Sequence, residues 1–224
     1  MAGVDSGVIS LLQLVPTLVL LVGVFMLADI ELSDIVPGAN DNASGVATAL
    51  SLAEALDAEP PENLDVWLLF TGGEECQMEG MRAFIRAHRK SIDPENTYFV
   101  VLDAVGAGEV RYETGEGLAV TYDMDRRLVQ LCDAVATADR ENGNRLAAKP
   151  LRQAFATDAL PARIAKLRAT AITCLADGSL LPVNYHRPED VPNRIEGEAL
   201  DRAHDFALEL ARALDRDAGR RASR

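Results

Sequence analysis

The chain contains few cysteines, few aromatic residues and too little positive charge to balance its negative charge. Its 224 residues include 3 cysteines, 5% aromatic residues, and 22 Lys and Arg against 35 Asp and Glu, for a formal net charge of −13. Without a basic field to displace counterions, a nucleic-acid partner is not expected. The length fits one α/β domain, and its core should be aliphatic, because hydrophobic residues make up 48%.

Several other motifs are also missing. The cysteines Cys76, Cys132 and Cys174 form no CxxC pair and no framework spacing, so we expect buried thiols and find little support for an oxidising compartment. No GxSxG motif is present, which argues against a hydrolase with a serine on a nucleophile elbow. The GxG in VGAGEVR lacks a third glycine and a following helix, which argues against dinucleotide binding.

The N-terminal segment 1–30 is predominantly apolar. Residues 8–27, VISLLQLVPTLVLLVGVFML, carry no charge and are numerous enough to span a bilayer. A secretory signal is disfavoured, because MAGVDSG contains no Lys or Arg. The run predicts a transmembrane helix and a membrane location. The alternative is a soluble cytoplasmic protein with an apolar helix followed by a buried strand near 20–28. The flanking charges are acidic, so they leave the orientation undetermined.

After residue 30 the sequence alternates between helix-like and strand-like patterns, which predicts a layered α/β fold. Apolar residues at helical spacing indicate helices, and short apolar runs between turn residues indicate buried strands. The expected helices are 42–57, 81–88, 125–139 and 196–214; the expected strands are 64–70 (LDVWLLF), 97–103 and 169–175, with a hairpin of 108–113 and 117–122. No repeat or linker interrupts this pattern. We therefore expect one domain over 31–217 and a disordered basic tail over 218–224.

Acidic residues follow three predicted turns or strands. Asp41 lies in the small-residue turn PGANDNASG, and the pair Glu74 and Glu75 follows a strand in FTGGEEC. Asp103 ends a strand in VVLDAVG, and His186 occupies the proline-bounded loop PVNYHRPED. Each alone is more often a helix cap or a solvated loop residue. Because ligands of open α/β sheets gather at the carboxyl ends of strands, the combination favours a metal site.

Together these motifs resemble metallopeptidase family twenty-eight of clan MH, the dinuclear zinc aminopeptidases. The resemblance covers residues 36 to about 212, and PGANDNASG, FTGGEE, VVLDAVG and YHRPED occur in the family's order. It implies a three-layer, phosphorylase/hydrolase-like zinc exopeptidase fold. Such a fold has a mostly parallel central sheet with helices on both faces, here preceded by the apolar segment.

The resemblance also implies a role for each residue. Asp41 would bridge two zinc ions and would be followed by a cis peptide bond. Glu75 and His186 would complete the ligands of one ion, and Asp103 would bind the other. Glu74 would act as the general base, which takes a proton from the attacking water and delivers it to the leaving amine. Oxygen and imidazole ligands suit zinc, and two adjacent ions can share and acidify a water.

One more acidic residue, Asp158 in ATDAL, has two interpretations. The first is a helix cap. The second is a residue that supports the metal pocket, because the family often has an acidic residue near this point.

The chain departs from the family at its first histidine ligand. Family members carry an HxD pattern about a dozen residues before the bridging aspartate. This chain has ADIEL there, with Asp29 at the histidine position and Glu31 at that of the orienting aspartate. Asp29 could substitute as an oxygen ligand. Alternatively, the HxD segment belongs upstream of a membrane-helix insertion, which the apolar run directly before PGAND favours.

The resemblance implies a zinc-dependent exopeptidase, most simply an aminopeptidase, with a peptide substrate and one or two zinc ions. Two alternatives remain open at this point. The missing histidine suggests a degenerate, non-catalytic metal-binding or scaffold member, although a purely structural descendant would have no use for Glu74. A glutaminyl-cyclase-like acyltransferase could also be built on the same fold.

Overall fold

The computed structural model describes residues 6–117 and 120–223, so part of the predicted strand 117–122 lies outside the described residues. The chain divides into two compact units, Met1–Val36 and Pro37–Arg224.

The first unit is the helix α1 (Ser6–Leu32), which contains Pro16. Its segment Gly7–Leu32 is long and apolar enough to cross a membrane, a test that a signal sequence near the N-terminus also meets. Residues 20–28 are helical and almost entirely exposed. The alternative of a buried strand at this place is therefore wrong.

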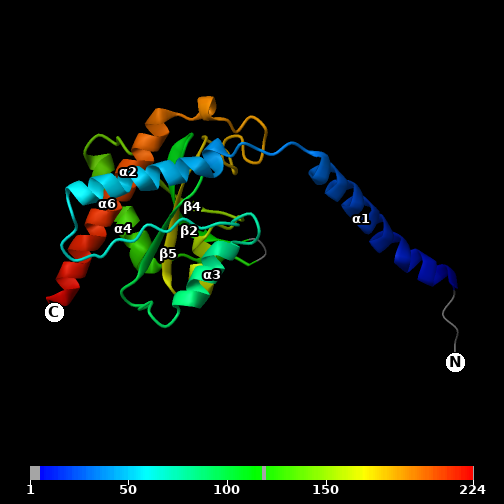
Figure 1. Cartoon of the computed structure of the whole chain (residues 1–224), viewed down its shortest axis with the longest axis horizontal. Helices are drawn as coiled ribbons and strands as arrows, with labels where there is room; N and C mark the ends of the chain where they lie inside the picture. The colour runs from blue at the N-terminus through cyan, green and yellow to red at the C-terminus, as the bar shows by residue number, and fades with distance from the viewer. Residues whose placement is uncertain (1–5, 118–119, 224) are drawn as a thin grey trace. The chain divides into compact units, whose positions relative to one another are not determined.

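The second unit contains a five-stranded sheet (Figure 1). Along the chain its strands are β1 (Tyr98–Leu102), β2 (Glu109–Glu116), β3 (Tyr122–Asp123), β4 (Lys149–Arg152) and β5 (Arg168–Leu175). Their order is β1-β5-β2-β3, and β4 also pairs with β2. The β1–β5 and β2–β4 pairings are parallel, whereas β2 is antiparallel to β5 and β3. The sheet is thus mixed rather than mostly parallel.

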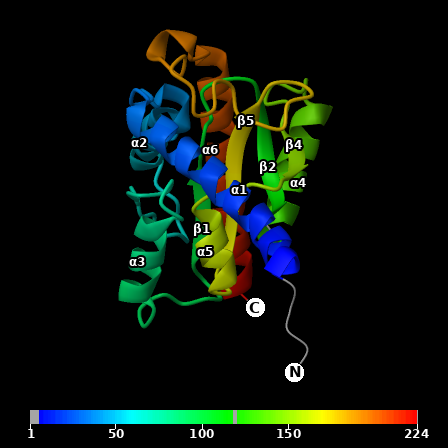
Figure 2. The same cartoon turned by 90° about the vertical axis from the view of Figure 1, so that its right-hand side faces the viewer.

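Helices cover both faces of this sheet, so the α/β fold class is confirmed. One face carries α2 (Gly45–Ala58), α4 (Arg126–Glu141) and α6 (Gly197–Ala222), and the other carries α3 (Glu79–His88) and α5 (Ala159–Ile164). Figure 2 shows α5 and α6 on opposite sides of the strands. α6 continues into the stretch 218–224 that the sequence predicts to be a tail.

The core follows from the side-chain alternation of β5. Ala169 and Ala171 belong to the cluster under α3 and α5, while Ile172 and Cys174 belong to the cluster under α4 and α6. Successive side chains of a strand point to opposite faces, so one strand supplies both layers. The predicted apolar face of α6 is confirmed: its members are all buried, namely Ala199, Ala203, Phe206, Leu210 and Leu214.

Three local predictions are wrong. Residues 64–70 form no strand, and five of their large side chains are exposed, Trp67 by 70%. An apolar run indicates burial, but a strand also needs a neighbouring strand with free backbone groups. No described strand pairs with residues 64–70. The turn expected at 114–116 lies inside β2. Cys76 is exposed, because it lies in the loop before α3, whereas Cys132 and Cys174 are buried as expected.

The C-terminal helix is anchored by a buried carboxylate. Asp217 is 3% exposed and accepts two hydrogen bonds from the guanidinium of Arg127. Arg220 and Arg221 also lie within ion-pair distance. The pKa of Asp217 is lowered, chiefly by the hydrogen bonds from Arg127 and further by the charges of these arginines.

We therefore predict that Asp217→Asn lowers the free energy of unfolding by about 2 kcal/mol at pH 7. A folded-state pKa below the unfolded value of about 3.9 means that this contribution is complete above that value and is lost as the pH falls further. Urea unfolding at several pH values from 7 down to about 2 measures it, because the loss falls below the unfolded pKa. Asp201→Asn, on an exposed position of the same helix, is the control. A difference that does not shrink with falling pH would contradict this assignment.

Candidate metal centre

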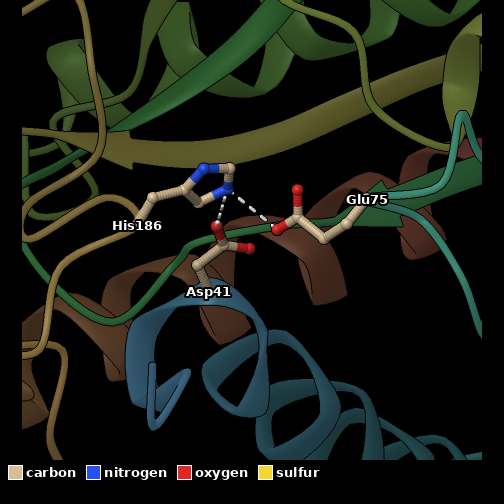
Figure 3. Close-up of side chains that lie close together, drawn as sticks. All are labelled: Asp41, Glu75 and His186. Carbon is tan, nitrogen blue, oxygen red and sulfur yellow. Dashed lines mark hydrogen bonds and ion pairs between the residues drawn. The ribbon is translucent and has the colours of Figure 1, made fainter. Parts of the chain in front are cut away.

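Three side chains from distant parts of the chain meet in one place: Asp41, Glu75 and His186 (Figure 3). The Nε2 atom of His186 lies 2.9 Å from Oε1 of Glu75 and 3.4 Å from Oδ2 of Asp41. One ligand atom from each residue lies within 4.8 Å of the others. Asp41 comes from the turn before α2, Glu75 from the loop before α3, and His186 from the loop after β5.

The turn Ala39–Ser44 holds Asp41 in a conformation that is not helical. The backbone departs from helical angles at Asp41 and Asn42, and the peptide bond between them is cis, as the resemblance implies. Gly38 precedes the turn with φ of 69°, and a Cβ atom there would lie 2.9 Å from the carbonyl oxygen of Asp41. Glycine is therefore the residue that fits this position.

Side chains of the same turn attach it to the end of β1. Oδ1 of Asn42 accepts a hydrogen bond from the N–H of Ala104 at 3.2 Å, and its Nδ2 donates to the carbonyl of Leu102 at 2.9 Å. The hydroxyl of Ser44 accepts from the N–H of Val105 at 3.0 Å. The small polar residues of PGANDNASG therefore fix the Asp41 carboxylate beside the strand end that carries Asp103.

Asp190 holds the turn from the other side. Its two carboxylate oxygens accept hydrogen bonds from the backbone N–H groups of Asn40, at 2.7 Å, and Asp41, at 3.1 Å. Asp190 is 1% exposed. It lies four residues after His186 in YHRPED, so one loop supplies a candidate ligand and also positions another. In the sequence only its place in YHRPED indicates a role for Asp190.

The imidazole of His186 is held by its own neighbours. The ring of Tyr185 stacks on it with centroids 3.8 Å apart, and His186 itself has φ of 54°. The left-handed region is costly for a residue other than glycine and occurs where surrounding contacts enforce it. The loop therefore presents one fixed imidazole nitrogen to the two carboxylates.

We predict that Asp190→Asn weakens zinc binding about tenfold, because residues that orient metal ligands typically contribute that much to affinity. The amide places an N–H where an oxygen now faces the N–H of Asn40 or Asp41, which loosens the turn. A competition titration with a chromophoric chelator measures the change. Glu189→Gln, at the exposed neighbouring position, is the matched control. Equal zinc affinity in both variants would show that Asp190 does not position the site.

Two further predicted residues, Glu74 and Asp103, lie near the three but outside the group of mutually close ligand atoms. Burial raises the pKa of Glu74 to about 8, followed by the charges of Asp103 and three other carboxylates. Burial also raises the pKa of Asp103 to about 7, followed by the charge of Asp41. The centre thus holds more carboxylates than it can keep ionised on its own.

Asp158 is the N-cap residue of α5, but its side chain makes no capping hydrogen bond. It accepts instead a short hydrogen bond from the hydroxyl of Thr71, just before the Glu74 loop. The interpretation as a cap is therefore wrong, because tertiary contact with Thr71 takes the carboxylate. The side chains of Glu113 and Glu116 are also fully buried, and no sequence motif indicated them. The charge of Glu116 contributes to the raised pKa of Asp103.

Asp29, the possible substitute ligand, lies in α1 and hence in the first unit. Among the described residues, the group of close potential ligands contains neither Asp29 nor Asp103.

The three side chains fit a zinc ion by their chemistry. One imidazole nitrogen and carboxylate oxygens are the donors that zinc takes in proteins. Among the described residues, His186 is the only ion-pair partner of Asp41 and Glu75. The pKa of Asp41 is raised by burial and then by the charge of Glu75. A bound cation would therefore offset the repulsion between these two carboxylates.

The fold resembles that of zinc aminopeptidases, and this donor set suits a zinc ion. Residues 24–211 match the sequence model of Peptidase family M28, and the chain belongs to that family. The resemblance seen in the sequence is thereby confirmed. No curated protein matches the chain.

Solved structures show the same fold. A zinc aminopeptidase from Bacillus subtilis has 21% identity and a TM-score of 0.61, covering 80% of this chain and 43% of that chain. A glutaminyl cyclase from an Acidobacteriales bacterium has 22% identity and a TM-score of 0.62, covering 80% and 63%. The LapA aminopeptidase of Legionella pneumophila has 16% identity and a TM-score of 0.61, covering 82% and 48%. The chain spans less than two thirds of each of these structures.

Proposed function

We propose that this chain is a zinc-dependent exopeptidase of the aminopeptidase type, which removes the N-terminal residue from a peptide. The observation that carries the proposal is the meeting of Asp41, Glu75 and His186 from three separate loops. Membership of a peptidase family supports the reaction class. The proposed location is a membrane, with α1 as the anchor.

Each residue has a distinct task in this proposal. Asp41, Glu75 and His186 would hold zinc, which would polarise the scissile carbonyl and acidify a water. Glu74 would take a proton on its carboxylate from the attacking water and return it to the leaving amine. Asp190 and Tyr185 would keep the ligands in place, through the hydrogen bonds and the stacking already described.

We propose one zinc ion for the side chains of this unit. The three close ligand atoms belong to Asp41, Glu75 and His186, which would all bind the same ion. A second ion would have only two ligands, Asp103 and the shared Asp41. Metal analysis of the purified, zinc-loaded chain tests this directly. A ratio near one supports the proposal, and a ratio near two would replace it with the dinuclear centre of the resemblance.

A second candidate reaction is aminoacyl transfer of the glutaminyl cyclase type. The specific observation in its favour is the three-ligand group, which suits a single ion, together with the fold shared with a glutaminyl cyclase. Both reactions need a polarised carbonyl and a carboxyl that moves a proton. They differ in the nucleophile, which is water in one and the α-amine of the substrate in the other.

Two substrates separate these reactions. The zinc-loaded chain is incubated with an aminoacyl anilide and, separately, with a peptide that begins with glutamine. Release of the anilide supports the peptidase, whereas loss of ammonia with formation of a pyroglutamyl peptide supports the cyclase. Neither reaction with one zinc bound would identify a non-catalytic member of the family.

Alkaline carbonate extraction of expressing cells tests the proposed anchor. The 26-residue segment Gly7–Leu32 of α1 is long and apolar enough to span a bilayer. A chain held by α1 should therefore remain in the membrane pellet and dissolve only in detergent. Recovery in the carbonate supernatant would contradict the proposal for α1 and leave the metal centre unaffected.

A further inference from the structure

A basic pocket lies on the second unit, away from the metal centre. Its hollow measures about 460 Å³, within the range of roughly 300–1,000 Å³ usual for small-ligand sites. Five cationic side chains line it against two carboxylates: Arg126, Arg127, Arg163, Lys166 and Arg168. This concentration of positive charge is unexpected in a chain with a formal net charge of −13.

Two of the five cations are neutralised by the protein itself. Arg168 pairs with Glu95 through a short hydrogen bond, and Arg127 pairs with the buried Asp217. These two guanidiniums are therefore occupied and contribute little net charge to the hollow.

The other three cations have no carboxylate partner among the described residues. Arg163 donates to the backbone carbonyls of Asp123, at 3.0 Å, and Leu167, at 2.5 Å, which fixes its guanidinium but leaves its charge. The exposed side chains of Arg126 and Lys166 form no ion pair or hydrogen bond in the described part of the chain. Asp125, the second lining carboxylate, accepts hydrogen bonds from backbone N–H groups at the start of α4. The hollow thus carries a net positive charge.

Ordinary helix electrostatics accounts for only part of this cluster. Arg163 and Lys166 lie at the carboxyl end of α5, where the helix dipole favours cations. Arg126 is different, because it is the first residue of α4 and lies at the end where the dipole disfavours a cation. The N-cap carboxylate of Asp125 offsets part of this cost, and an anion bound between Arg126 and Lys166 would offset the rest.

We propose that the basic pocket binds a small phosphate-bearing anion. Guanidinium and ammonium groups make charge-assisted hydrogen bonds to phosphate oxygens, and three of the lining cations have no carboxylate partner among the described residues. The side chain of Gln130 also lines the hollow and can donate from its amide. A cation or an apolar ligand has no comparable partners here.

The pocket lies at the opposite end of the sheet from the metal centre. Arg168 is the first residue of β5, which runs parallel to β1, and Asp103 follows the last residue of β1. Tyr98 of β1 pairs with Arg168, and Asp103 lies five residues beyond Tyr98. Strands rise about 3.3 Å per residue, so the two ends are separated by roughly 17 Å. The pocket is therefore distinct from the metal centre, and the inference holds whichever reaction that centre performs.

The test is calorimetric titration of the full chain in nonionic detergent with pyrophosphate. The salt concentration is kept low, at about 50 mM, because charges are screened less at low ionic strength. The pocket variant is Arg126→Ala with Lys166→Ala. The matched control is Arg89→Ala with Lys90→Ala, which removes the same charge from an exposed site at the end of α3. We expect saturable binding by the unmodified chain and the control, and at least about tenfold weaker binding by the pocket variant.

Other outcomes overturn the proposal. These are absence of saturable binding by the unmodified chain, an equal loss in both variants, and no loss in the pocket variant. A second arm repeats the titration in micelles that contain phosphatidic acid. If the lipid abolishes pyrophosphate binding, the phosphate is that of a lipid headgroup, and unchanged binding indicates a soluble phosphate compound.

Discussion

Replacing Glu74 by glutamine should lower turnover of an aminoacyl anilide by a factor of about 10²–10⁴, the usual contribution of a positioned acid–base group. The amide has nearly the same shape, but it cannot accept the proton of the attacking water. Glu74 lies outside the group of close ligand atoms, so the zinc content of the variant should equal that of the unmodified chain. Steady-state kinetics and metal analysis on the same preparation measure both effects.

Glu79→Gln is the control for this substitution. Glu79 is an exposed residue at the start of α3, only five positions further along, and its replacement should leave turnover unchanged. Activity of Glu74→Gln within twofold of the unmodified chain would remove Glu74 from the mechanism. Loss of zinc together with activity would instead make Glu74 a ligand.

Replacing His186 by alanine should remove the metal. This change leaves only the carboxylates of Asp41 and Glu75, whose negative charges repel one another. Bound zinc should fall from about one equivalent to less than about a tenth, since zinc sites need at least three protein ligands. Zinc at about 100 times its Kd should stabilise the unmodified chain by about 2.7 kcal/mol and the variant by almost nothing. Metal analysis and thermal unfolding with and without zinc measure these effects.

His88→Ala is the control, because His88 lies at the end of α3, where its ring contacts Phe84. That variant should keep its zinc and its response to zinc. Full zinc content in His186→Ala would show that the three close ligand atoms do not form the metal site.

The elements that the sequence predicts well are those with regular apolar spacing or alternation. β1, β5, α4 and α6 lie within a few residues of the predicted ranges except at the end of α6, because local periodicity and burial agree there. LDVWLLF is the opposite case. Its composition is that of a strand, but pairing depends on which other strand lies beside it, and that is a property of the whole fold.

The candidate site divides in the same way. The sequence alone determined the family, and it predicted the kinds of ligand and the turn that carries Asp41, because these depend on residue type and on spacing within short motifs. Only the tertiary structure decided which carboxylates meet His186, that Asp103 lies outside that group, and that Asp190 and Thr71 hold Asp41 and Asp158. These contacts join residues more than 80 positions apart. Such proximity is set by the packing of loops at the sheet edge rather than by any local pattern.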